Sequence, residues 1–444
     1  MKTKRTFLFS LLLTWVMVPR ALAADVTIDQ ARVVAQRFAS AASRFSLSAS
    51  QPLALAHTAM SRDGHPDYYV FNRGSDDGFV VISGDDRLQA VCAYSETGHF
   101  MPDELPCNVK AWFEDYQRQV QYLRSHADAS PRLAQRLAAS VSPLLTTRWH
   151  QCRPFNDLCP EAASQDDPYW IYGNHACTGC VATSTAQLMN YYEWPKRGTG
   201  SFSYYTQVTF YDPNQGHHDV RGETLSANFG ETVYEWDKMR DQYLYKDKNS
   251  RGYIDEQGHV YIKIIDDNGD TIPDPDGMYS AAVARLMSDV GIAVKMSYGD
   301  EASSAETEDQ MNALEQYFGY ETEYRWREEY QGDWEALLRS DLAAGHPLII
   351  CGYGYSGGHA FIIDGYDSQG LFHVNWGWGG RYDGYFQNTV LNPGGMDFSI
   401  YQECVLALPV GDDVLRGDVD GDGNVAISDV TALIDYLLGG SWDS

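Results

Sequence analysis

The alternation of apolar and polar positions predicts a small mixed unit at the N-terminal end of the chain. Apolar residues recur at helical spacing across 28–38, and Thr27–Gln30 forms a capping box at the start of that helix. Two β-rich runs between residues 68 and 82 are each followed by a Gly/Asp turn. A second amphipathic helix is predicted across 109–123. We therefore expect an α+β unit before the Ala/Ser-rich linker 132–142.

The pattern changes after residue 144. Helices are predicted at 181–192 and 281–290, on either side of a long polar stretch with acidic turns at 205–277. Beyond Pro347, short β-type runs alternate with glycines, at 348–350, 360–363, 372–376 and 384–386. The sequence thus predicts a helical half followed by a sheet half.

Composition narrows the class of protein without naming its chemistry. The chain has 444 residues, 44% of them hydrophobic, and a formal charge of −28. This length favours several domains with a sizeable core. Because a strongly acidic surface repels phosphate backbones, we expect no nucleic-acid partner.

The first 23 residues are typical of a secretory signal peptide. A basic start, Lys2 to Arg5, precedes the apolar run 7–18 and the small-x-small site Ala21-Leu22-Ala23. That run is too short to span a bilayer, and no later stretch is long and apolar enough. We expect a secreted protein without a transmembrane segment, in which disulfides are permitted.

One cysteine has the surroundings of a nucleophile. Gly179 precedes Cys180 and a helix-compatible run follows, which predicts that Cys180 stands at a helix N-terminus. There the macrodipole and the free N–H groups favour a thiolate and lower the thiol pKa. The same N–H groups can hold an oxyanion. A half-cystine or a buried small residue is the alternative interpretation.

Two later motifs bear on this cysteine. His359 enters an apolar strand directly after two glycines, which let a substrate backbone approach closely. Alternation places His373 and Asn375 on one face of the next strand, and Val374 and Trp376 on the other. An asparagine can accept from imidazole Nδ1–H and fix the tautomer. Taken singly, the histidine is more typical of a hydrogen-bonded core residue, and the second motif of an aromatic hairpin.

The order of Cys, His and Asn-Trp follows the arrangement of papain-like proteases. Segments 179–187, 357–361 and 373–380 closely resemble the streptopain family of secreted bacterial cysteine peptidases. The resemblance spans most of residues 144–408. It implies that Cys180 is the nucleophile and that His359 takes its proton and later donates it to the leaving amine.

The resemblance also implies supporting roles. Asn375 would orient His359, while Trp376 and Trp378 would wall the site. Ser304 and Gly358 fall where this family contacts the backbone of a substrate.

An oxyanion donor and an inhibitor are implied as well. Papain-like enzymes use a side-chain amide shortly before the nucleophile as an oxyanion donor, and Asn174 stands in that region although a glutamine is expected there. The family's zymogens carry an inhibitory N-terminal domain, which suits residues 24–143, with activating cleavage in or near 132–142. Members tend to accept a hydrophobic residue at the second position before the cut.

The remaining cysteines leave alternatives open. Cys177 and Cys180 form a Cys-x-x-Cys pair, which also fits a thiol–disulfide oxidoreductase. A redox dithiol has no need of the histidine and Asn-Trp motifs. Cys177 can instead pair with Cys152 or Cys159, and the spacing does not decide between them.

The end of the chain carries a calcium motif. Within 418–429, carboxylates and a glycine take the positions of an EF-hand loop, with Asp in place of the final Glu. The segment resembles half of a type I dockerin, which implies a cohesin-like or cell-surface partner, yet one loop of the usual two is present. The triplet at 266–270 lacks the matching glycine and is predicted to be a turn. The expected Ca²⁺ ligands are Asp418, Asp420, Asp422, Asn424 and Asp429.

These inferences predict an α+β fold. It comprises a papain-like two-part catalytic domain, with a helical half plus an antiparallel β-sheet half, an N-terminal α+β propeptide domain and a short C-terminal EF-hand-like segment. The predicted function is a secreted cysteine endopeptidase made as a zymogen, acting on protein or peptide substrates without a cofactor for catalysis. A catalytically silent binding or adhesion protein, or an oxidoreductase, is the alternative. The expected domains are 1–23, 24–143, 144–410 and 411–444.

Overall fold

The computed structural model covers most of the two larger expected domains. The expected signal peptide and the whole segment 411–444, with its calcium loop, lie outside the described residues, as do 131–138 of the linker. The described residues are 25–41, 53–126, 139–162, 174–212, 214–244, 253–254, 260–266, 268–274, 276–354, 357–388 and 402–410.

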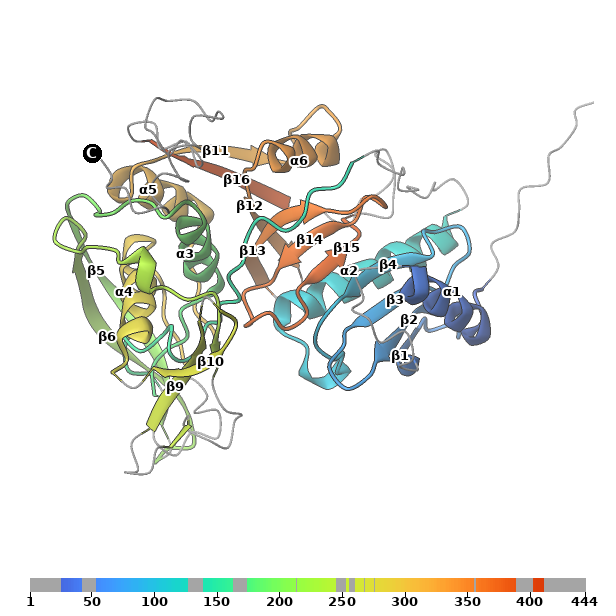
Figure 1. The fold of residues 1–444 in the computed structure, drawn as a ribbon, viewed down its shortest axis with the longest axis horizontal. Helices are drawn as coiled ribbons and strands as arrows, with labels where there is room; N and C mark the ends of the chain where they lie inside the picture. Colours follow the sequence, from blue (N-terminus) through green and yellow to red (C-terminus); the bar gives the residue numbers. More distant parts are fainter. Residues whose placement is uncertain are drawn as a thin grey trace, which may run out of the picture.

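The N-terminal unit is a sheet with one helix on each face (Figure 1). Its elements are α1 (Ile28–Ala41), β1 (Leu53–Met60), β2 (Pro66–Arg73), β3 (Phe79–Ser83), β4 (Val91–Ser95), the 3₁₀ turn η1 (Pro102–Glu104) and α2 (Cys107–Ser125). The predicted capping box is confirmed, because Thr27 N donates to Gln30 Oε1 (2.8 Å) and Gln30 N donates to Thr27 Oγ1 (3.3 Å). Alternate residues of β2 and β3 face α1 and α2, which buries both faces.

The N-terminal strands belong to a sheet shared with the C-terminal half. The ten strands follow the order β1-β2-β3-β4-β15-β14-β13-β12-β16-β11, and neighbouring strands are antiparallel. The two domains meet where Tyr385 pairs with Tyr94, a stacked ring pair with centroids 4.9 Å apart. A Cβ on Gly384 would lie 2.3 Å from Tyr94 O, so only glycine permits this approach. The other strands are β11 (Tyr320–Trp326), β12 (Leu348–Gly354), β13 (Gly357–Tyr366), β14 (Phe372–Asn375), β15 (Gly384–Phe386) and β16 (Gln402–Pro409).

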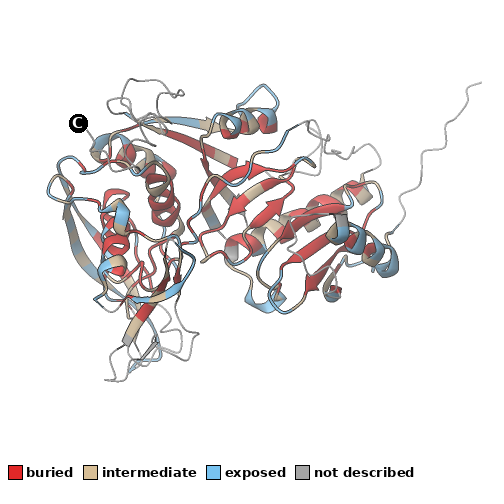
Figure 2. Cartoon of the chain, viewed as in Figure 1, coloured by how far each residue is buried: buried red, intermediate tan, exposed pale blue. Residues whose placement is uncertain are grey.

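Helices cover both faces of the C-terminal part of this sheet (Figure 2). One face, with Ala360 and Ile362, packs against α3 (Cys180–Tyr192), α4 (Met278–Ala293) and α5 (Thr307–Tyr317). The opposite face, with Phe372 and Val374, packs against α2 of the N-terminal unit and α6 (Trp334–Ala343). The predicted helical half and sheet half are thus confirmed, and α5 and α6 are additional to the prediction.

The stretch 205–277 contains more regular structure than its polarity indicated. A long hairpin joins β5 (Ser201–Asp212) to β6 (His217–Asn228), and β5 buries Val208 and Thr206 while most of the hairpin is exposed. The sequence predicted no strands in this stretch, because only one face of an exposed hairpin needs apolar residues. The predicted turn at 266–270 is confirmed, since Asn268 N and Asp270 N donate to Asp266 Oδ1. The further elements are η3 (Trp236–Lys238), β7 (Tyr243–Leu244), β8 (Tyr253–Ile254), β9 (Val260–Ile265) and β10 (Thr271–Asp274).

Among the residues that the structure describes, every helix is too short or too polar to cross a lipid bilayer.

Candidate active site

Cys180 is the first residue of α3, as the sequence predicted. Its N-cap Gly179 has φ 83° and ψ 150°, a conformation that disfavours L side chains. A Cβ at Gly179 would lie 2.9 Å from both Met296 Sδ and Ser303 O. Glycine therefore brings the chain tightly past these neighbours and starts the helix at the cysteine.

The thiol of Cys180 is nevertheless held neutral in this form. Burial raises its pKa, against the backbone N–H groups of Ala360, Cys180 and Val181, which favour the thiolate. The expectation of a lowered pKa at the helix N-terminus was wrong for this form because desolvation outweighs those N–H groups. The contact with Ala360 places the sulfur one residue from His359 along β13.

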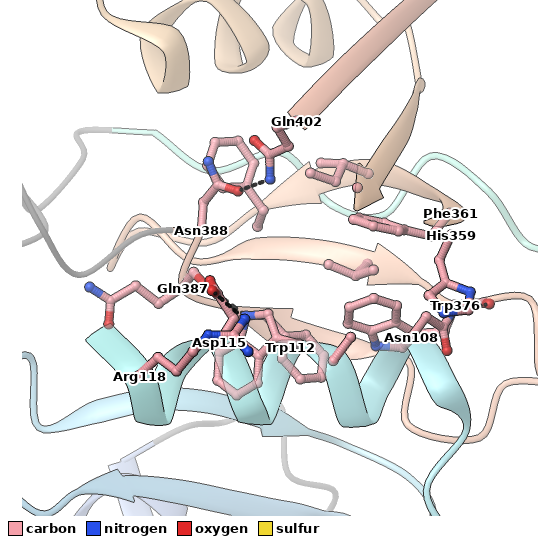
Figure 3. Close-up of a pocket in the computed structure, with 16 residues that line it drawn as sticks. Asn108, Trp112, Asp115, Arg118, His359, Phe361, Trp376, Gln387, Asn388 and Gln402 are labelled. Atoms are coloured by element: carbon pink, nitrogen blue, oxygen red, sulfur yellow. Dashed lines mark hydrogen bonds and ion pairs between the residues drawn. The ribbon is translucent and has the colours of Figure 1, made fainter. Parts of the chain in front are cut away.

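His359 lies on the face of β13 that α2 covers. It lines a cavity of about 110 Å³ together with Phe361, Trp376, Asn108 and Trp112 (Figure 3). Alternation puts Phe361 on the same side of the strand, while Ala360 faces α3. Burial lowers the pKa of His359, which favours the neutral imidazole. Burial thus favours the neutral form of both the Cys180 thiol and the His359 imidazole.

The N-terminal end of α2 occupies the site beside this histidine. Asn108 Nδ2 donates to Trp376 O at 3.0 Å, and Trp378 Nε1 donates to Asn108 Oδ1 at 2.9 Å. One turn later, the Trp112 ring packs edge-on against Phe386 with centroids 5.0 Å apart. The side-chain amide of Asn108 thus hydrogen-bonds both the Trp376 carbonyl and the Trp378 indole N–H.

Both polar atoms of the Asn375 side chain are hydrogen-bonded, and their partners include Gln187 on α3. Asn375 Nδ2 donates to Thr147 O (2.8 Å) and to Gln187 Oε1 (3.1 Å). Asn375 Oδ1 accepts from Gln187 Nε2 and Gly377 N, both at 3.1 Å. The structure therefore brings Asn375 to the nucleophile helix rather than to His359.

The other predicted site residues have the following surroundings. The Trp376 ring packs against Phe361, with centroids 4.8 Å apart, and the Trp378 ring packs against His150 at 5.4 Å. Gly358 is exposed at the start of β13. Ser304 is exposed and pairs through its backbone with Ser297, one residue from the Ser303 carbonyl that contacts the N-cap.

Asn174 lies in a turn six residues before Cys180. Its φ is 67°, and its carbonyl accepts from Ala162 N at 3.1 Å. A buried glutamine that the sequence did not single out, Gln151, contacts the loop before the nucleophile, because Thr178 N donates to Gln151 O at 3.1 Å. Gln151 precedes Cys180 by 29 positions, so its contact with this loop depends on the fold.

The neighbouring cysteines do not behave as a redox pair here. Cys152, Cys159 and Cys177 are all free thiols in this structure, so neither of the two alternative pairings of Cys177 is formed. Cys177 Sγ donates to Ser303 Oγ at 3.4 Å, and burial raises the pKa of Cys177 to about 11. A buried thiol of such low acidity is a poor attacking group for disulfide exchange.

No group of three or more potential metal-binding side chains is present in the described ranges. The five expected calcium ligands, Asp418 to Asp429, lie outside those ranges.

Comparisons with known proteins agree with this geometry. Residues 149–386 match the Peptidase C10 family, and residues 23–120 match the Spi protease inhibitor model. Streptopain of Streptococcus pyogenes is 31% identical over 355 residues, covering 77% of this chain and 80% of streptopain. The thiol protease/hemagglutinin PrtT of Porphyromonas gingivalis is 30% identical over 433 residues, 91% of this chain, which spans only 44% of that relative's length.

A solved structure has a similar fold. A fragment of prointerpain A of Prevotella intermedia, with a Cys-to-Ala substitution, is 32% identical, with a TM-score of 0.58. The match covers 80% of this chain and 98% of the fragment.

Proposed function

Because this chain belongs to the Peptidase C10 family and is a cysteine peptidase with its own inhibitor domain, we propose how its residues divide the work. Cys180 attacks the scissile carbonyl and forms an acyl-enzyme, which water then hydrolyses. His359 takes the thiol proton and delivers it to the leaving amine, and Asn375 orients the imidazole. The observation that carries this proposal is the hydrogen bond between Ala360 N and the Cys180 sulfur. Ala360 directly follows His359 in β13, so the sulfur lies next to the residue that carries the imidazole.

The N-terminal domain keeps this machinery idle by occupying the histidine's side of the sheet. Asn108 holds the Trp376 carbonyl and the Trp378 indole, while Trp112 fills the apolar surface next to His359. When α2 leaves, His359 loses the burial that lowers its pKa and gains room to approach Cys180. Activation therefore consists of domain release, after cleavage in or near 132–142.

We propose Gln151 rather than Asn174 as the side-chain donor to the oxyanion. Gln151 is buried and its backbone holds the loop that leads into Cys180, which suits a preorganised donor. The N–H of Cys180 at the start of α3 is the second donor. Ser304 and Gly358, both exposed beside the nucleophile, contact the substrate backbone, and Trp376 and Trp378 shield the site from water.

The boundaries and destination complete the proposal. Residues 1–23 direct export, 24–143 inhibit, 144–410 cleave proteins outside the cell, and 411–444 bind Ca²⁺ through Asp418, Asp420, Asp422, Asn424 and Asp429. The acidic oxygen ligands at EF-hand spacing support the calcium site. The dockerin-like pattern supports a cohesin-like or cell-surface partner for the same segment.

A protease assay tests the catalytic roles. The full-length wild type, Cys180→Ala and Cys177→Ala are nicked in the linker with trypsin, which is then quenched with a serine-protease inhibitor, and casein cleavage is followed. We expect cleavage by wild type and Cys177→Ala, and none by Cys180→Ala. A folded and processed wild type that leaves casein intact contradicts the proposal.

A melting experiment tests the tail. We expect Ca²⁺ to raise the melting temperature of the full-length wild type and to have no effect on Asp418→Ala. A calcium effect that persists in Asp418→Ala contradicts the proposed loop.

A further inference from the structure

Gln187 is a buried glutamine on the nucleophile helix that has no role so far. It lies about two turns after Cys180 on α3, and its side chain is 1% exposed. Burying a side-chain amide is costly unless its donors and acceptor are satisfied. The partners of Gln187 are therefore the guide to its role.

The partners of Gln187 come from both walls of the site. Its Oε1 accepts from Thr147 Oγ1 at 2.9 Å and from Trp149 N at 3.3 Å. The same oxygen accepts from Asn375 Nδ2, and Gln187 Nε2 donates back to Asn375 Oδ1, both at 3.1 Å. Two side-chain amides thus face each other in a reciprocal pair.

This pair leaves Asn375 only one orientation. Thr147 O can accept but not donate, and Gly377 N can donate but not accept. A flipped Asn375 amide would oppose oxygen to oxygen and N–H to N–H at both contacts. Gln187 reinforces the same orientation from α3, while its own amide is fixed by Thr147 Oγ1 and Trp149 N.

We propose that Gln187 is a positioning residue, which fixes the Asn375 amide relative to the helix that carries Cys180. The inference rests on the proposed role of Asn375 in orienting His359. Since Asn375 is on β14 and Cys180 on α3, the reciprocal pair connects the sheet to the helix that carries Cys180. The direction of the Asn375 amide is therefore already set before His359 moves.

A matched pair of substitutions tests this role. Gln310 on α5 is also a buried glutamine bonded to α3, through Thr185 Oγ1 at 2.6 Å, but it does not touch Asn375. Gln187→Met and Gln310→Met each remove a buried side-chain amide that lies on α3 or is hydrogen-bonded to it. The full-length chains are nicked and quenched as above, titrated for active thiol, and compared by kcat, KM, pH profile and melting temperature.

We expect both variants to melt at lower temperature, and only Gln187→Met to change the chemistry. Its kcat falls by about tenfold with KM nearly unchanged, as the loss of hydrogen bonds to one positioned group implies. The alkaline limb of its kcat/KM profile moves to lower pH, because a poorly oriented imidazolium loses its proton more readily. Gln310→Met keeps the wild-type profile.

Gln187→Glu provides a rescue that a purely structural residue would not show. A protonated glutamic acid can donate to Asn375 Oδ1 and accept from Thr147 and Trp149, as glutamine does. Burial raises the pKa of such a carboxyl. We expect kcat near the wild-type value at acidic pH, with a fall as the carboxyl ionises and its oxygens oppose Asn375 Oδ1.

The outcomes separate this inference from the proposed function. An inactive wild type refutes the proposed function itself. An active wild type with a Gln187→Met variant that matches Gln310→Met in kcat and pH profile overturns the positioning role. If Gln187→Met does not fold, a pH profile of Gln187→Glu identical to that of wild type overturns it instead.

Discussion

The two faces of the peptidase half of the sheet have partners of different origin. The face with Ala360 and Ile362 packs against α3, from the same domain, and Asn375 is joined to that helix through Gln187. The face with Phe361 and Trp376 packs against α2, from the N-terminal domain. The first set of contacts belongs to the peptidase domain itself, whereas the second, on the face that carries His359, comes from the N-terminal domain and can be removed.

The largest difference between the two faces is expected when one core side chain is truncated in a helix from each face. Leu188 on α3 and Phe113 on α2 are both almost fully buried. Each change to Ala is expected to cost about 2–5 kcal/mol. Leu188→Ala should melt early and lose activity, whereas Phe113→Ala should weaken the inhibitor and give earlier casein cleavage from the full-length chain. A Phe113→Ala chain that stays latent for as long as wild type contradicts the distinction.

The stability of the folded chain is expected to depend on pH through Asp383, near the junction between the two domains. Burial raises the pKa of Asp383 to about 7, with nearby Asp364 adding to the rise and His373 and Arg148 opposing it. Because the folded state binds this proton more tightly than the unfolded state, stability falls as pH rises from about 4 to about 7, by at most about 1.4 kcal/mol per pH unit.

Asp383→Asn is the variant that isolates this term. Asparagine keeps the acceptor for Trp376 N, which is 2.9 Å from Asp383 Oδ1. The measurement is the melting temperature against pH, and the variant should show a flatter profile below pH 7. His373, whose pKa is also raised, contributes a loss at higher pH that the variant retains. Parallel profiles for variant and wild type would refute the assignment to Asp383.

Asn108→Ala should sharpen the comparison with a smaller effect. The change removes two hydrogen bonds between α2 and the tryptophan motif, worth about 1–3 kcal/mol together. We expect the full-length chain to become active several-fold sooner, measured as the lag before casein cleavage. The exposed Lys110 on the same helix is the control, and Lys110→Ala should keep the wild-type lag. Equal lags in the two variants count against the role of Asn108.

The smallest effect is expected far from the site. Thr27→Ala removes the capping contact of α1 and should destabilise the N-terminal unit by about 1 kcal/mol. The lag before casein cleavage by the full-length chain should shorten less than in Asn108→Ala, because α1 lies on the sheet face away from α2. A lag as short as that of Asn108→Ala would contradict this ranking.

Local signals predicted much of the fold and the place of Cys180 at the start of a helix. Gly179 before an apolar run located the start of α3 at Cys180, and period-two alternation correctly put Val374 and Trp376 on one face. The capping box at Thr27 was likewise legible because it involves residues close in sequence. Such features depend on backbone conformation within a few residues.

The rest depends on contacts between distant segments. Nothing around His359 shows that α2 covers it, or that Tyr94 pairs with Tyr385 to join the two domains. The bond between Gln187 and Asn375 spans 188 positions and leaves no periodic trace. The pKa of Cys180 was predicted in the wrong direction for this form because burial is set by the whole fold.

The pairing of β4 with β15 has a consequence for the processed enzyme in solution. Once the N-terminal domain departs, β15 becomes an outer strand whose N–H and C=O groups are open to any other chain. Only three residues, Gly384–Phe386, form that strand, which limits the template for self-association. By pairing with β15, the inhibitor domain therefore also covers a strand edge that could otherwise pair with another chain. We expect the processed enzyme to associate as its concentration rises.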